Sequence, residues 1–138
     1  MRDHAMHQTA HQSLVTDEST LEQLIAHSHQ EPVWLFNHDP WCGISAAAWE
    51  ELEQLDVRVN VIDVARYHNL RTLVAARTGV RHQSPQIILL QGGRAVWSAS
   101  HFRVTAKNVR QTLAAQTGQA DGASGPETES AERPWWRI

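Results

Sequence analysis

The sequence predicts one α/β domain whose mixed four-stranded sheet is flanked by helices. A wholly apolar run at residues 33–36 is typical of a buried parallel strand with helices on both faces. Helix-like and strand-like patterns alternate after it, and a glycine turn at residues 91–94 separates two further strands, which indicates a hairpin. With 138 residues, 41% of them apolar, the chain is long enough for one such core with tails.

The first half of the chain supplies a helix, the buried strand and a second helix. The first helix is expected between residues 20 and 29, because Thr20 is suited to cap it and Pro32 cannot continue it. After the apolar strand, residues 37–40 have the composition of a loop. Residues 41–55 are rich in Ala and Glu, which favours a helix.

The second half adds a strand–helix unit, a hairpin and a closing helix. The expected elements are, in order, a strand at 57–62, a helix from Asn69 to just before Gly79, strands at 86–90 and 95–100, and a helix that Thr105 caps. With a right-handed crossover, this order is that of the minimal thioredoxin fold. We expect the domain to span residues 16–117, between a disordered His-rich tail at 1–15 and a flexible, Trp-containing tail at 118–138.

The composition argues against several classes of partner. The net charge of −3 gives no electrostatic reason to bind nucleic acid or an anionic membrane, and no apolar run approaches the roughly 18 residues of a membrane span. The N-terminus lacks the apolar core of a signal peptide, so the expected location is the cytoplasm. His4, His7 and His11 would share a helix face, but their segment has no other helix signal. We therefore expect no metal site and no bound cofactor.

The single cysteine, Cys42, is the candidate reactive group. It cannot form a disulfide within the chain, so any disulfide must join it to another molecule. A lone cysteine is usually buried and inert, but this one follows the buried strand and opens a helix. Crevices in open α/β sheets lie at the carboxyl ends of strands, and the first turn of a helix favours negative charge. The placement therefore predicts a reactive thiol.

Three neighbours of Cys42 bear on its reactivity. Ser45 lies one helical turn further on, so its hydroxyl or backbone N–H could donate to the sulfur. Asp39 would oppose the thiolate and a protonated His38 would favour it, so these two residues predict opposite effects.

A proline loop is the second candidate feature. Ser84 and Pro85 directly precede the third predicted strand, and a proline fits only the first residue of such a strand. Most X-Pro bonds are trans, but the thioredoxin fold places a cis-proline loop beside the active cysteine. The backbone of Ser84 would then pair with an extended substrate segment. His82 and His101, which flank this region, either lie on the surface or line the thiol site.

Three segments of the chain match one protein family. They are FNHDPWCGISAAA at residues 36–48, GVRHQSPQ at 79–86 and GRAVWSASH at 93–101. They resemble the monothiol bacilliredoxins, small thioredoxin-fold proteins of bacteria that use bacillithiol as their low-molecular-weight thiol. The likeness extends over roughly residues 18–115. The family usually has Pro after the cysteine, where this chain has Gly43, and Ser45 stands where thioredoxins have the resolving cysteine.

The resemblance implies a function. Bacilliredoxins remove bacillithiol from mixed disulfides on oxidised client proteins, so Cys42 would take the bacillithiol and a second thiol would regenerate it. The expected partners are therefore bacillithiolated proteins and a small thiol, with bacillithiol as the co-substrate. The residues expected to contact the substrate around the catalytic Cys42 are Trp41, Gly43, Ser45, His82, Ser84 and Pro85.

Two other functions stay open at this point. The chain could be a redox-inactive binding module that uses the Pro85 groove and the Trp135–Trp136 tail, which docks on this domain, on a partner or on neither. It could also be a peroxide sensor or peroxidase in which Cys42 forms a sulfenic acid. A peroxide-reactive cysteine usually needs a nearby arginine, and none lies close to Cys42 in the sequence. The cysteine count itself excludes a dithiol thioredoxin reaction.

Overall fold

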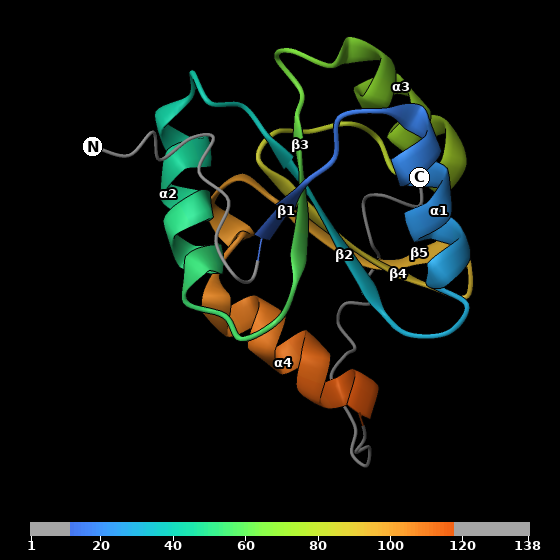
Figure 1. The fold of residues 1–138 in the computed structure, drawn as a ribbon. Helices are drawn as coiled ribbons and strands as arrows, with labels where there is room; N and C mark the ends of the chain where they lie inside the picture. Colours follow the sequence, from blue (N-terminus) through green and yellow to red (C-terminus); the bar gives the residue numbers. More distant parts are fainter. Residues whose placement is uncertain (1–11, 118–138) are drawn as a thin grey trace.

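The computed structural model describes residues 12–117 (Figure 1). The elements are β1 (Gln12–Leu14), α1 (Glu18–His27), β2 (Val33–His38), α2 (Gly43–Glu53), β3 (Val59–Asp63), α3 (His68–Thr78), β4 (Gln86–Gln91), β5 (Arg94–Ser100), η1 (His101–Arg103) and α4 (Ala106–Thr117). The predictions for the tail at 118–138, the tryptophans in it and the histidines at 4, 7 and 11 lie outside the described residues.

The sheet has five strands in the order β1-β3-β2-β4-β5. The strands β1, β3 and β2 are parallel, whereas β4 and β5 are antiparallel to β2 and to each other. The predicted mixed sheet flanked by helices is confirmed, but the predicted number of four strands is wrong by one. The missed strand, β1, lies within the segment expected to be a tail, and its three residues are too few to show a strand periodicity.

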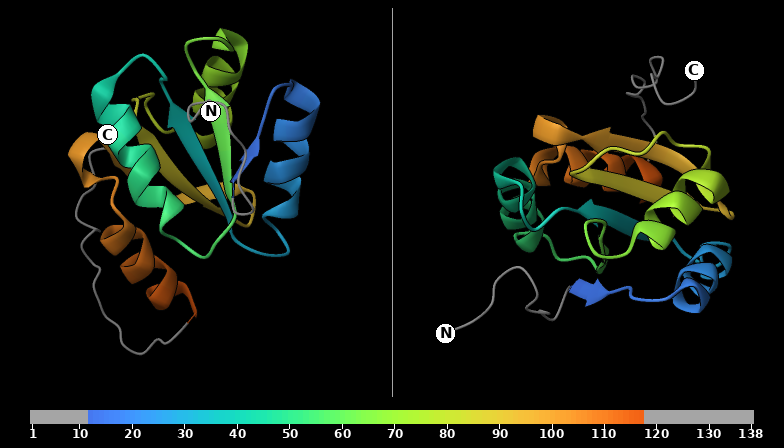
Figure 2. Two further views of the ribbon diagram at one scale, coloured as in Figure 1. Left: turned by 60° about the vertical axis from the view of Figure 1, so that its left-hand side comes forward. Right: turned by 90° about the horizontal axis from the view of Figure 1, so that it is seen from above.

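Each face of the sheet carries its own core, and helices cover both faces (Figure 2). On one face, Trp34 and Phe36 of β2 pack with side chains of α2 and α4. On the other, Val33 and Leu35 pack with side chains of α1 and α3. Because successive side chains of a strand point to opposite faces, a strand buried on both faces must be apolar throughout. This explains the apolar run in the sequence.

The helix ends show where sequence capping signals were right and where they shifted. Asp17, not Thr20, caps α1, and its carboxylate accepts the Thr20 N–H at 2.7 Å. Gly79 ends α3 with a left-handed backbone (φ 74°), as expected of a glycine at that position. At α4, the hydroxyl of Thr105 accepts the N–H of Asn108, as the prediction of a cap there requires. None of the helices in residues 12–117 has the length and apolarity to cross a membrane.

Candidate functional site

The cysteine loop and the proline loop predicted from the sequence lie at the same edge of the sheet. Asn37, next to last in β2, pairs with Gln86, the first residue of β4, and Gln86 also pairs with Ser100 at the end of β5. His38 pairs in parallel with Asp63, so β3 ends at this edge as well. The loop that carries the cysteine, the proline loop and η1 therefore start or finish at one edge of the sheet, as predicted for an α/β site.

Cys42 is the N-cap of α2. Its backbone is extended (φ −110°, ψ 125°), its carbonyl accepts the N–H of Ala46 at 3.0 Å, and its side chain makes no capping hydrogen bond. The Cys42 N–H donates to the Asp39 carbonyl at 3.0 Å, which closes a tight turn. Cys42 is partly exposed and forms no disulfide. A partly exposed cysteine at the N-terminus of a helix is well placed to act as a nucleophile.

Ser45 holds the loop in front of the thiol rather than the thiol itself. Its side chain is fully buried, and its hydroxyl accepts the Asp39 N–H at 2.9 Å and lies 2.8 Å from Nδ1 of His38. The hydroxyl is thus engaged by the loop, so the bond to the sulfur expected from the sequence is not seen. The Asp39 carboxylate in turn accepts the Trp41 N–H at 3.0 Å. These bonds fix the backbone of the loop that presents Cys42.

His38 is a buried, uncharged partner for Ser45. Its ring is 3% exposed, stacks on Phe36 at 5.3 Å and lies 4.8 Å from the ring of Trp49. Burial lowers the pKa of His38 from 6.5 to about 4, although the charges of Asp63 and Asp39 oppose the shift. At neutral pH the ring therefore brings no positive charge to the thiol. Its Nδ1 can accept the Ser45 hydroxyl proton, since that oxygen already accepts the Asp39 N–H.

The residues on either side of Cys42 are open to solvent. Trp41 is 88% exposed, and Gly43 is also exposed. A Cβ built on Gly43 would meet nothing within 4 Å, and its φ lies outside the left-handed region. Neither space for a Cβ nor a left-handed backbone therefore requires glycine here. Phe102, in η1 at the same edge, is 79% exposed. Trp41 and Phe102 are the only large apolar side chains exposed among the described residues.

The proline loop lies at this edge as predicted. The Ser84–Pro85 peptide bond is cis, Pro85 is buried, and its carbonyl accepts the N–H of His101 at 2.9 Å. Ser84 is half-buried, and the exposed His101 has a left-handed backbone (φ 56°). His82 is half-buried; burial, with the charge of Arg71, lowers its pKa. The structure thus brings the predicted loop residues to the edge that carries Cys42.

Two functional candidates at this edge were missed from the sequence. Asn37 and Gln86 are both buried in the sheet, and the Asn37 side-chain amide donates to the Gln86 side-chain carbonyl at 2.8 Å. Asn37 was assigned to a loop because it follows the apolar run, although β2 continues through His38. The signal that could have found the pair was a polar residue directly adjoining each of two buried strands.

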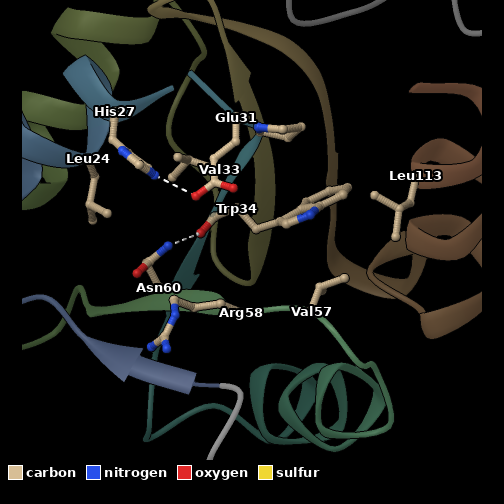
Figure 3. A pocket seen from close by; sticks show the side chains of 10 residues that line it. Leu24, His27, Glu31, Val33, Trp34, Val57, Arg58, Asn60 and Leu113 are labelled. Carbon is tan, nitrogen blue, oxygen red and sulfur yellow. Dashed lines mark hydrogen bonds and ion pairs between the residues drawn. The ribbon is translucent and has the colours of Figure 1, made fainter. Parts of the chain in front are cut away.

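The opposite end of the sheet holds a cavity of about 320 Å³ (Figure 3). It lies between the end of α1, the starts of β2 and β3, and α4, with Trp34 and Leu113 on its apolar side and the His27–Glu31 ion pair on its polar side. Cys42 is not among its lining residues. Within residues 12–117, no three His, Cys, Asp or Glu side chains are grouped so as to hold a metal ion.

Comparison with solved structures identifies the fold. A protein described by its thioredoxin fold is 23% identical, with 75% of this chain and 94% of that chain covered and a TM-score of 0.69. A mutant thioredoxin from Halobacterium salinarum NRC-1 is 16% identical, with 84% and 99% covered and a TM-score of 0.64. The thioredoxin of Fasciola hepatica is 17% identical, with 73% and 95% covered and a TM-score of 0.59. The chain therefore has the predicted thioredoxin-like fold.

A family model narrows this assignment. The model described as monothiol bacilliredoxin BrxC matches residues 13–109, which include all of the described elements from α1 to η1. The matched segment contains Cys42, the proline loop and the buried residues that hold both. A thiol at the start of α2, a serine one turn later and a cis-proline loop at the same edge agree with this match. The chain is a thiol redox protein of the monothiol bacilliredoxin family.

Proposed function

We propose that this protein removes bacillithiol from mixed disulfides on oxidised proteins through Cys42. The observation that carries the proposal is the position of Cys42 as the partly exposed N-cap of α2, in a loop held by Ser45. Such a thiol can meet a disulfide on another molecule, and thiol–disulfide exchange needs that access. The match to the bacilliredoxin family supports bacillithiol as the group transferred.

The reaction divides into two exchanges. The Cys42 thiolate attacks the bacillithiol sulfur of the mixed disulfide; that S–S bond breaks, and the client leaves as a thiolate that takes up a proton. The new bond joins Cys42 to bacillithiol. A second thiol, in its thiolate form, then attacks the bacillithiol sulfur, which releases the Cys42 thiolate and leaves the oxidised pair as a small disulfide.

The second exchange must be intermolecular. Cys42 is the only cysteine of the chain, and Ser45, one turn further on, has a hydroxyl that cannot attack a disulfide under these conditions. A low-molecular-weight thiol is therefore the proposed reductant, with bacillithiolated proteins as the clients. Such thiols and their protein adducts belong to the reducing cytoplasm, where we propose that this protein acts.

The test is the intact mass of the purified protein after incubation with bacillithiol disulfide. We expect one bacillithiol adduct on the wild type, reversed by added thiol, and none on Cys42→Ser. An adduct-free wild type, under conditions in which free cysteine reacts readily, would contradict the proposal and favour a redox-inactive binding module. Loss of the thiol to peroxide alone, with no small thiol present, would instead favour a peroxide sensor.

A further inference from the structure

Two buried amides lie under the proline loop, on the face of the sheet opposite to α2. Asn37 and Gln86 are 1% and 0% exposed, and they face each other across the β2–β4 ladder. They continue the alternation that places Val33, Leu35 and Ile88 in the core shared with α1 and α3. The polar pair therefore adjoins the point where the loop from α3 enters the sheet.

Gln86 ties this loop to the sheet through both ends of its amide. Its side-chain N–H donates to the carbonyl of Arg81 at 2.9 Å, and its side-chain oxygen accepts the Asn37 amide at 2.8 Å. The same oxygen accepts the N–H of Gln83 in a longer contact of 3.4 Å. One side chain thus bonds to the loop backbone on the N-terminal side of Ser84 and to the strand that leads to Cys42.

Stability alone does not account for the pair. The Asn37 side-chain carbonyl is buried without a hydrogen-bond partner among the described residues. A buried polar group without a partner costs free energy, and two apolar side chains of similar shape would avoid that cost. The arrangement is therefore an incomplete polar network in a mostly apolar core, and its bonds to the loop backbone point to a positioning role.

We propose that Asn37 and Gln86 are positioning residues that set the loop containing Ser84 as a docking edge for the client polypeptide. This inference rests on the proposed function, because it concerns the client of the same exchange. An extended client segment beside its mixed disulfide would pair with the loop backbone, and such pairing depends on the loop being held in register with β2. A small disulfide has no polypeptide to dock, so it depends on the thiol alone.

The experiment compares two exchange rates for each variant. One probe is a single-cysteine protein carrying bacillithiol, and the other is bacillithiol disulfide, with transfer to Cys42 followed by mass. For Gln86→Met we expect the ratio of the protein rate to the small-disulfide rate to fall by about tenfold or more, since loss of orientation weakens the client step specifically. Asn37→Leu leaves the two loop bonds of Gln86 in place and should lower the ratio less.

Two further variants separate positioning from stability. Asn60→Val removes another buried amide, whose N–H donates to the Trp34 carbonyl at 3.0 Å at the other end of the sheet, and should leave the ratio unchanged. The double variant Asn37→Leu with Gln86→Met leaves neither side-chain amide of the pair unpartnered and should be more stable than Gln86→Met alone, while its ratio stays low.

A ratio that returns to the wild-type value in this double variant, or one that Gln86→Met never changes, would overturn the inference. Failure of the wild type to exchange with either probe would instead contradict the proposed function.

Discussion

Two loops at the same edge of the sheet are held by different side chains, one pair on each face of the sheet. On the face of α2, His38 and Ser45 hold the loop that presents Cys42. On the face of α3, Asn37 and Gln86 hold the loop that precedes β4. The first tie contains a titratable ring and the second contains only amides, which do not titrate. The loop of Cys42 and the loop proposed to dock the client therefore have separate supports. Acid acts on the first support through His38, and on the second loop only through His82, whose pKa burial also lowers.

Of the variants considered, Ser45→Cys should change the reaction of Cys42 most. A second thiol would then lie three residues from Cys42 in the first helical turn, where Cα atoms are about 5 Å apart, within the range that a disulfide spans. We expect the bacillithiol adduct on Cys42 to become short-lived, because the new thiol attacks Cys42 internally and releases bacillithiol. Mass spectrometry would show a product lacking two hydrogens. A persistent adduct would show that the helix start is too rigid to close.

Acid should weaken the contact between His38 and Ser45 on the α2 side. The pKa of His38 is about 4 in the folded chain, against 6.5 ordinarily, so between these values the unfolded chain binds the extra proton and the folded chain does not. The free energy of unfolding should therefore be complete above pH 6.5 and fall by up to about 3 kcal/mol as the pH drops to 4.

Urea unfolding across this pH range measures the effect. His38→Phe should unfold more easily at neutral pH, because Ser45 loses a partner, yet its stability should lack this pH dependence. An unchanged slope in His38→Phe would assign the acid effect to His82, whose pKa burial also lowers, or to the carboxylates.

Much of this arrangement could be predicted from the sequence. The apolar strand, the helix that Cys42 opens and the proline before β4 are local patterns, and each was read correctly. The buried ties could not be read in the same way. His38 and Ser45 are brought together by a turn, and Asn37 and Gln86 are 49 residues apart in the chain. Whether such polar residues are buried, charged or paired depends on tertiary packing, which no local pattern contains.

The strand β1 is a second feature that no local sequence pattern predicted. Its residues, Gln12–Leu14, carry no strand periodicity and belong to the sheet only because β3 offers a free edge. Helix boundaries shifted for a similar reason, since Thr20 has the right chemistry for a cap but Asp17 has the right position.

The smallest expected effect concerns Gly43. As the first residue of α2, it has no intrahelical partner for its N–H, and a Cβ there would meet nothing within 4 Å. Gly43→Pro should therefore raise the free energy of unfolding by about 0.4–1 kcal/mol, because proline restricts the unfolded chain. Urea midpoints at neutral pH measure this, with Gly79→Pro as the control: Gly79 has φ 74°, which proline cannot adopt, so that variant should be destabilised.

A single-turnover experiment can show whether Cys42 takes bacillithiol from a protein. A bacillithiolated single-cysteine protein is mixed with an equal amount of this protein, and the masses of both chains are followed together. We expect bacillithiol to leave the client as the same mass appears on the wild type, and Cys42→Ser to leave the client modified. A client that stays modified, or one that forms a lasting protein–protein disulfide with Cys42 while bacillithiol is released, would contradict this expectation.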